Sequence, residues 1–107
     1  MEIVKSGISE VIFNQSGAMG RKLAVNNGCE YVYLTIERNA GIAPHALPIP
    51  VTFFVVAGVG EVSADGHSFS VEKNDCFTVA PGVVREWKNR SDTLVELLVI
   101  KHLPEAQ

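Results

Sequence analysis

Hydrophobic and polar residues alternate in short runs along almost the whole chain. The runs are rich in β-branched and aromatic residues, and turn formers such as Asn26-Asn27-Gly28 and Asn39-Ala40-Gly41 separate them. No segment has a convincing helical period. Short strands at regular spacing are typical of an all-β sandwich or barrel. The expected strands cover residues 10–13, 21–25, 31–38, 52–57, 60–64, 68–73, 76–79, 85–88 and 93–101.

Two of the turns have a defined chemistry. Asp65-Gly66 lies between two alternating runs and suits a type I′ hairpin turn, in which both central residues need a positive φ. Pro81-Gly82 suits a type II turn, because proline has a fixed negative φ for the first corner and glycine accepts a positive φ at the second. Asp65-Gly66 therefore predicts a β-hairpin, and Pro81-Gly82 predicts a tight turn.

The composition describes a small domain with enough apolar material for a core. The chain has 107 residues, of which 47% are hydrophobic, and its net charge is −3. We expect a single domain over residues 1–107. The acidic balance argues against a nucleic-acid partner, which requires a basic face. No apolar run is long enough for a membrane-spanning helix, so we expect no membrane partner.

The N-terminal segment and the cysteines bear on where in the cell the protein is expected. The segment from Met1 to Glu10 lacks the basic and then apolar pattern of a signal peptide. Cys29 and Cys76 lie far apart and form no CxxC motif. We therefore expect a cytoplasmic protein with two reduced thiols, in which Cys76 packs as a small hydrophobic side chain.

Glycines, turns and polar residues follow one another in a particular order between residues 41 and 89: Gly41, His45, Gly58-Val59-Gly60, Asp65-Gly66, Asn74-Asp75, Pro81-Gly82 and Asn89. This order resembles the two motifs of the cupins, G-x5-H-x-H-x3-4-E-x6-G and G-x5-P-x-G-x2-H-x3-N, in their small single-domain, RmlC-like form. The resemblance implies an antiparallel jelly-roll β-barrel, with motif 1 at about residues 41–60 and motif 2 at about residues 74–89. The chain departs from the second motif at Asn74, which stands where glycine is usual, and at Pro81, which lies one place later than the motif proline.

The resemblance also locates a metal site whose ligands have changed. The positions of the two motif-1 histidines, the glutamate and the motif-2 histidine carry His45, Leu47, Val51 and Arg85 in this chain. Aliphatic side chains and a guanidinium offer no lone pair to a metal. We therefore expect no metal at this site and no cofactor.

The same resemblance implies that these four positions point into the barrel. Strand alternation extends the inward face from Val51 to Phe53 and from Arg85 to Trp87, and places Phe54 outside. The expected ligand-binding residues are therefore His45, Leu47, Val51, Phe53, Arg85 and Trp87. On the strand at residues 31–38 both alternating sets are apolar, so the set that faces the lumen is either Tyr31, Tyr33 and Thr35 or Val32, Leu34 and Ile36.

Polar residues inside the barrel need partners. Arg85 has two candidates: Glu96, which interrupts the apolar run at residues 94–100, and an anionic ligand, which the planar guanidinium recognises well. His45 lies in a stretch too rich in proline for a regular central strand. We expect its imidazole at the pocket rim, either in a functional role or hydrogen-bonded to the backbone. His67 and His102 are expected in solvent.

Three functions remain open on these residues. The first is a metal-free domain that binds a small, anionic organic molecule in the lumen. The second is a metal-independent sugar or small-acid isomerase or epimerase, a chemistry that some cupins perform, in which His45 abstracts a proton and Tyr31 or Tyr33 donates one. The third is a metalloenzyme with unusual ligands drawn from His45, Glu86 and Cys76.

The chain is also expected to form a homodimer. The strands at residues 31–36 and 52–56 are apolar on both faces, whereas a lone barrel needs only its inner face apolar. Large exposed apolar patches are avoided in monomeric proteins, and cupins often dimerise. We expect a second copy of the chain to cover these outer faces.

Overall fold

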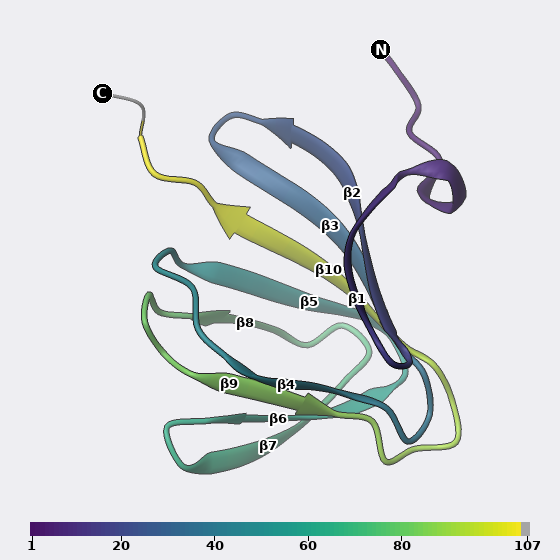
Figure 1. Ribbon diagram of the computed structural model, residues 1–107, viewed down its shortest axis with the longest axis vertical. Helices are drawn as coiled ribbons and strands as arrows, with labels where there is room; N and C mark the ends of the chain where they lie inside the picture. Colours follow the sequence, from purple (N-terminus) through teal and green to yellow (C-terminus); the bar gives the residue numbers. More distant parts are fainter. Residues whose placement is uncertain (106–107) are drawn as a thin grey trace.

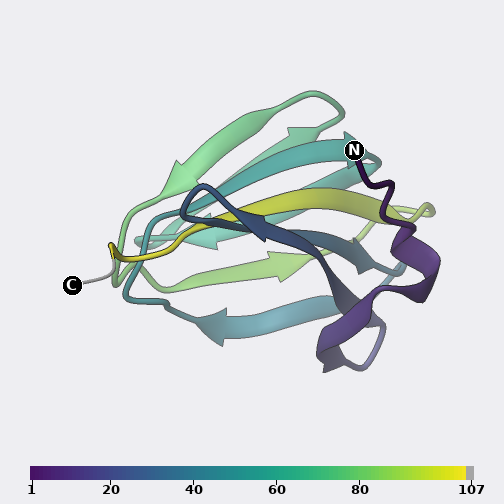
Figure 2. The ribbon, with the colours of Figure 1, turned by 90° about the horizontal axis from the view of Figure 1, so that it is seen from above.

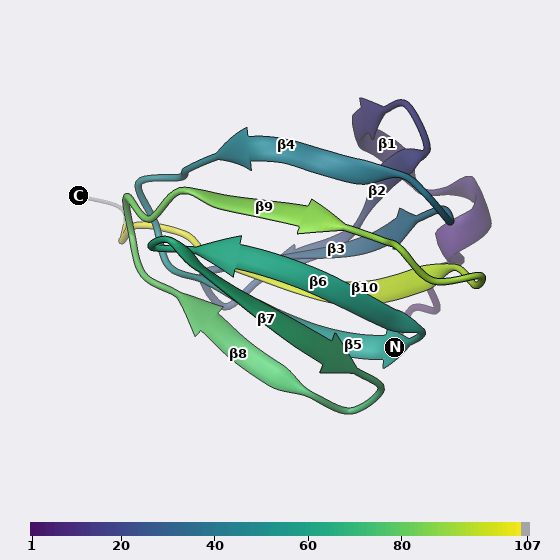
Figure 3. The same cartoon turned by 90° about the horizontal axis from the view of Figure 1, so that it is seen from below.

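The computed structural model describes residues 1–105, and in it the chain forms two antiparallel β-sheets that face each other (Figures 1 and 3). The larger sheet has the strand order β1-β2-β3-β10-β5-β8, and the smaller sheet has the order β4-β9-β6-β7. The strands are β1 (Glu10–Gln15), β2 (Ala18–Asn26), β3 (Cys29–Ile36), β4 (Gly41–His45), β5 (Val51–Ala57), β6 (Val59–Ala64), β7 (His67–Glu72), β8 (Cys76–Val79), β9 (Arg85–Lys88) and β10 (Val95–His102).

Helical structure in the described part of the chain is limited to one 3-10 turn, η1, at Ser6–Ile8. This turn lies beside β2 at the edge of the molecule, outside the two sheets (Figure 2). Over residues 1–105, therefore, nothing helical has the length and hydropathy that a membrane crossing requires.

The core lies in the space between the sheets. Along β5, Val51, Phe53 and Val55 are buried, whereas Thr52 and Phe54 between them are only partly buried. The same alternation buries one set of side chains on β3, β9 and β10. Because each strand presents one apolar face to the same interior, the two sheets share one core. The predicted all-β, antiparallel jelly-roll architecture is confirmed.

Both predicted turns form. At the hairpin between β6 and β7, Asp65 has a φ of 51° and Gly66 a φ of 76°, as a type I′ turn requires. At the second turn the N–H of Val83 donates to the carbonyl of Ala80 at 3.3 Å, and Gly82 has a φ of 80°. This hydrogen bond closes a four-residue turn with proline at the first corner and glycine at the second.

One strand was missed in the sequence. The segment Gly41–His45 forms β4, although it contains Pro44. Proline is tolerated here because β4 lies at the edge of the smaller sheet and pairs with β9 alone. Gly41 is required at the start of β4, because a Cβ there would lie 2.5 Å from the carbonyl oxygen of Trp87.

The structure decides which face of β3 is buried, and it overturns two expectations. Val32, Leu34 and Ile36 face the core, so Tyr31, Tyr33 and Thr35 lie on the outer face of the larger sheet.

Cys76 is exposed, because it shares the outward face of the edge strand β8 with Thr78. His102 is not simply solvated, because its Nε2 lies 2.8 Å from Oγ1 of Thr52 and its Nδ1 lies 3.7 Å from Sγ of Cys29. His67, at the exposed hairpin, lies where it was expected.

Candidate functional site

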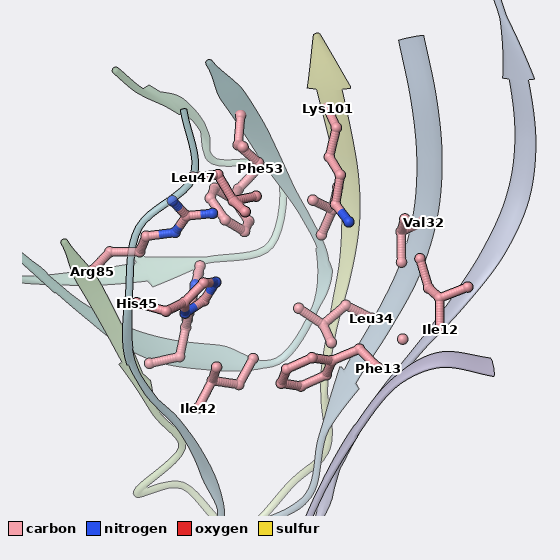
Figure 4. A pocket seen from close by; sticks show the side chains of 14 residues that line it. Ile12, Phe13, Val32, Leu34, Ile42, His45, Leu47, Phe53, Arg85 and Lys101 are labelled. Atoms are coloured by element: carbon pink, nitrogen blue, oxygen red, sulfur yellow. The ribbon is translucent and has the colours of Figure 1, made fainter. Parts of the chain in front are cut away.

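A cavity of about 190 Å³ lies between the two sheets. All six residues predicted to face the lumen line it, and they come from β4, β5, β9 and the loop between β4 and β5 (Figure 4). The complete lining is Ile12, Phe13, Gly20, Val32, Leu34, Ile42, His45, Leu47, Val51, Phe53, Arg85, Trp87, Val99 and Lys101. The wall is thus mainly aliphatic and aromatic, with a few polar groups, as small-molecule sites generally are.

Arg85 is the most unusual member of this wall. It opens β9 on the same inward face as Trp87, and its side chain is only 2% exposed. Within residues 1–105 its Nε and Nη1 atoms have no hydrogen-bond partner. The guanidinium carbon lies 5.8 Å from the centre of the Phe53 ring, and Figure 4 shows the guanidinium next to the Phe53 and Leu47 side chains. Burial lowers the pKa of Arg85 from its ordinary value, although a guanidinium keeps its charge at physiological pH.

The alternative partner for Arg85, Glu96, lies on the other side of the sheet. Val95 and Leu97 are fully buried, so strand alternation turns Glu96 to the outer face of β10. There its carboxylate accepts a hydrogen bond from the hydroxyl of Tyr33. The alternative in which Arg85 pairs with Glu96 is therefore wrong, and the alternation of β10 contained the signal that rules it out.

His45 ends β4 at the rim of the cavity, as expected. Its side chain is exposed, and its Nδ1 lies 3.2 Å from the carbonyl oxygen of Ala43. Desolvation lowers the pKa of His45, the positive charges of Arg85 and Lys101 add to this effect, and the hydrogen bond to Ala43 opposes it. The imidazole is therefore neutral at physiological pH.

The loop after His45 is tied by its backbone to the turn that precedes β9. The carbonyl of Leu47 accepts a hydrogen bond of 2.8 Å from the N–H of Gly82. This bond joins the β4–β5 loop to the Pro81-Gly82 turn, which leads into β9. The predicted type II turn thus ties the loop that carries Leu47 to the segment that leads into Arg85, although the two are far apart in the sequence.

An aromatic cluster forms one wall of the cavity. The ring of Trp87 lies 5.4 Å from that of Phe53 and 5.8 Å from that of Phe77, measured between centroids. Trp87 is 1% exposed, and within the described residues its Nε1 has no hydrogen-bond acceptor. Two neighbouring buried side chains on β9 therefore carry donors whose partners the described chain does not supply.

Lys101 was missed in the sequence. It continues the inward series Val95, Leu97 and Val99 on β10, so the alternation of that strand could have found it. Its Nζ forms an ion pair of 3.3 Å with Oε1 of Glu30. Figure 4 shows Lys101 on the side of the cavity opposite Arg85. Nothing in the sequence indicated that Ile12 and Phe13 of β1 and Gly20 of β2 would line the cavity, because no local pattern shows which strands will close it.

The residues required by the enzymatic alternatives do not converge on the cavity. Neither Tyr31 nor Tyr33 lines it, since both lie on the outer face of β3. Residues 1–105 contain no group of three or more His, Cys, Asp and Glu side chains placed to hold a metal. Glu86 and Cys76 do not line the cavity that His45 borders. The geometry therefore brings together an apolar cavity and cationic donors, without a proton-donating tyrosine.

The resemblance seen in the two motifs extends through most of the strands that build the cavity. The profile of the cupin domain family, Cupin_2, matches residues 32–101, which is more than half of the chain. The chain belongs to the cupin family. This cupin carries Leu47, Val51 and Arg85 on the inner face of its barrel, at positions where the motifs have two histidines and a glutamate.

Solved structures with the same fold have low sequence identity to this cupin. KdgF from Halomonas sp. has a TM-score of 0.81 and 14% identity, over 98% of this chain and 96% of that one. A predicted oxalate decarboxylase from Thermotoga maritima has a TM-score of 0.81 and 16% identity, over 96% of this chain and 100% of that one. The polyketide cyclase RemF from Streptomyces resistomycificus has a TM-score of 0.84 and 14% identity, over 100% of this chain and 82% of that one. At these identities the similarity establishes the fold alone, and no curated protein matches the sequence.

Proposed function

We propose that this cupin binds a small organic anion in the lumen of its barrel, with Arg85 as the anchor. The observation that carries the proposal is the burial of the Arg85 guanidinium in the cavity wall without a hydrogen-bond partner for Nε or Nη1 among residues 1–105. Leu47, Val51, Phe53 and Trp87 supply apolar contact around it. His45 supplies a second polar contact at the rim.

The energetics of burial support a ligand for Arg85. Moving a charge from water into the protein interior costs on the order of several kcal/mol per ion unless a partner compensates it. A guanidinium has donors in a planar fork, which matches a carboxylate or a phosphate through two parallel hydrogen bonds. A bound anion would therefore return to Arg85 the interactions that burial removes.

The test is a thermal-shift screen of organic acids and sugar phosphates against wild-type protein and Arg85→Met. A ligand anchored by Arg85 raises the Tm of the wild type in proportion to its affinity and leaves Arg85→Met unchanged. Glu86→Gln is a matched control, because it alters a charged neighbour on β9 that does not line the cavity. An acid that stabilises wild type and Arg85→Met equally would show that Arg85 is not the anchor.

We also propose that the protein is a homodimer that buries the outer face of the larger sheet. On this face Leu98 of β10 lies beside Tyr33 of β3 and Phe54 of β5, and Ile100 lies beside Tyr31. These side chains are only partly buried in the single chain. They form an apolar stripe across three adjacent strands, of the kind that a twofold-related copy can cover.

Light scattering at micromolar concentration tests this second proposal. The expected result is twice the mass of the chain for the wild type and the mass of one chain for Leu98→Lys, which places a charge in the middle of the stripe. Val59→Lys is the control, because Val59 is an exposed apolar residue of the smaller sheet. A wild type that scatters as a monomer would contradict the proposal.

A further inference from the structure

We infer that the ligand of the lumen is a monocarboxylate with a compact apolar body, rather than a phosphate ester or a dicarboxylate. The inference rests on the proposed function and narrows the ligand to one chemical class. Three features of the cavity lead to it: the number of uncompensated charges, the kind of polar atoms on the wall, and the volume.

The first feature is the charge of the lining. Arg85 and Lys101 are its two permanently charged residues at physiological pH, and no carboxylate belongs to the lining. Lys101 already has a carboxylate partner in Glu30 at 3.3 Å. One buried positive charge, that of Arg85, is therefore left to be balanced within residues 1–105. A ligand with one negative charge balances it, whereas a second negative charge would be placed against an aliphatic and aromatic wall at a high desolvation cost.

The second feature is that the deep polar atoms are donors. The buried groups without a partner in residues 1–105 are Nε and Nη1 of Arg85 and Nε1 of Trp87, and none of these accepts a hydrogen bond. A sugar phosphate would bury many hydroxyl donors, and the aliphatic wall offers them few acceptors. A carboxylate presents acceptors alone, and its two oxygens match two adjacent N–H groups of one guanidinium.

The third feature is the size of the cavity. A volume of about 190 Å³ is close to that of a cavity that holds one benzene ring, which is about 150 Å³. Phe53 and Trp87 offer ring faces, and Ile42 and Leu34 offer branched aliphatic surface. A single aromatic ring or a short branched chain fills this space, and a polyhydroxylated ring would lose its hydration there without replacement.

The experiment compares aromatic probes that carry one ring and differ in charge. Isothermal titration of wild-type protein is carried out with benzoate and phenylacetate, with their neutral counterparts benzamide and phenylacetamide, and with the dianions phthalate and phenyl phosphate. We expect a monocarboxylate to bind at least about tenfold more tightly than its neutral counterpart, which is the effect of one charge-assisted hydrogen-bond pair. The dianions are expected to bind more weakly than the monocarboxylates. This comparison needs no variant, so it does not depend on the folding of a mutant.

Two variants then separate the two cations. Arg85→Gln should remove the preference for benzoate over benzamide, whereas Lys101→Gln should retain it, because Lys101 is paired with Glu30. If phenyl phosphate or phthalate binds more tightly than the monocarboxylates and depends on both cations, the inference is wrong while the proposed anion site stands. If none of the six probes nor any acid in the thermal-shift screen binds in an Arg85-dependent way, the proposed function itself fails.

Discussion

Two buried polar side chains stand at opposite ends of β9, and their surroundings differ completely. Asn89, just after the strand, is 1% exposed and makes four hydrogen bonds: its Nδ2 donates to the carbonyls of Ile36 and Thr93, and its Oδ1 accepts from the N–H and the hydroxyl of Ser91. Arg85, at the start of the strand, is 2% exposed, and Nε and Nη1 find no partner in the described chain.

The difference distinguishes a structural polar residue, Asn89, from a candidate ligand-binding residue, Arg85, on one strand. Asn89 ties the turn after β9 to the end of β3, so its polar atoms are satisfied by the fold itself. Arg85 carries a charge that the fold desolvates and does not compensate among residues 1–105. Buried polar groups are normally satisfied, so an exception at the wall of a cavity points to a partner from outside the chain.

The largest expected effect on stability is that of substituting Asn89, whose polar atoms are all hydrogen-bonded. Asn89→Ala should lower the free energy of unfolding by about 2–4 kcal/mol, because it removes four side-chain hydrogen bonds, among them the buried bond to the carbonyl of Ile36. Urea unfolding measures this change. Arg90→Ala is the control, because it removes an exposed ion pair with Glu61 and should cost at most about 1 kcal/mol. Equal effects of the two substitutions would remove the structural role assigned to Asn89.

At the other end of β9, removal of the buried polar side chain is not expected to lower the free energy of unfolding. Arg85→Met should leave the free energy of unfolding unchanged or raise it by up to about 2 kcal/mol, because it replaces an uncompensated buried charge with an apolar chain of similar length. The same urea titration, without added ligand, measures it. A loss as large as that of Asn89→Ala would mean that the guanidinium has a structural partner, and the contrast between the two residues would disappear.

A third, smaller effect tests the outer face of the larger sheet, where polar groups are paired. Burial raises the pKa of Tyr33 from 10.0 to about 12, and the hydrogen bond to Glu96 and the charge of that carboxylate add to the rise. The folded protein thus holds the phenol proton more tightly than the unfolded chain. This contribution to stability is complete below pH 10.0 and is lost as the pH rises toward 12. Unfolding measured across this range should show a loss in the wild type that is smaller in Tyr33→Phe. Identical alkaline profiles would show that the Tyr33–Glu96 pair does not affect stability.

The smallest effect is expected at the rim of the cavity. The pKa of His45 is lowered from 6.5, so the unfolded chain takes up this proton more readily than the folded protein. The contribution of neutral His45 to stability is therefore present above pH 6.5 and is lost as the pH falls below it. The Tm of His45→Gln should fall less than that of the wild type on acidification. His67→Gln, which removes an imidazole outside the cavity lining, is the control. If both variants follow the wild type, the pKa of His45 is not coupled to folding.

Much of the site could be predicted from sequence because the relevant signals are local. The inward face that joins Val51 to Phe53 and Arg85 to Trp87 follows from the two-residue period of a strand, and the turns at Asp65-Gly66 and Pro81-Gly82 follow from residues that accept their dihedral angles. The alternative in which Arg85 pairs with Glu96 is wrong because strand alternation turns Glu96 to the outer face of β10, away from the cavity.

The chain by itself therefore determined an all-β cupin with an apolar inner face and a guanidinium at a metal-ligand position. The tertiary structure alone decided that β4 is an edge strand able to hold Pro44, that Val32 rather than Tyr33 faces the core, and that Lys101 reaches the cavity already paired with Glu30. These facts depend on contacts between segments that are distant in sequence. Whether a buried charge has a partner is a property of everything around it, and the residues around Arg85 come from strands that only the fold brings together.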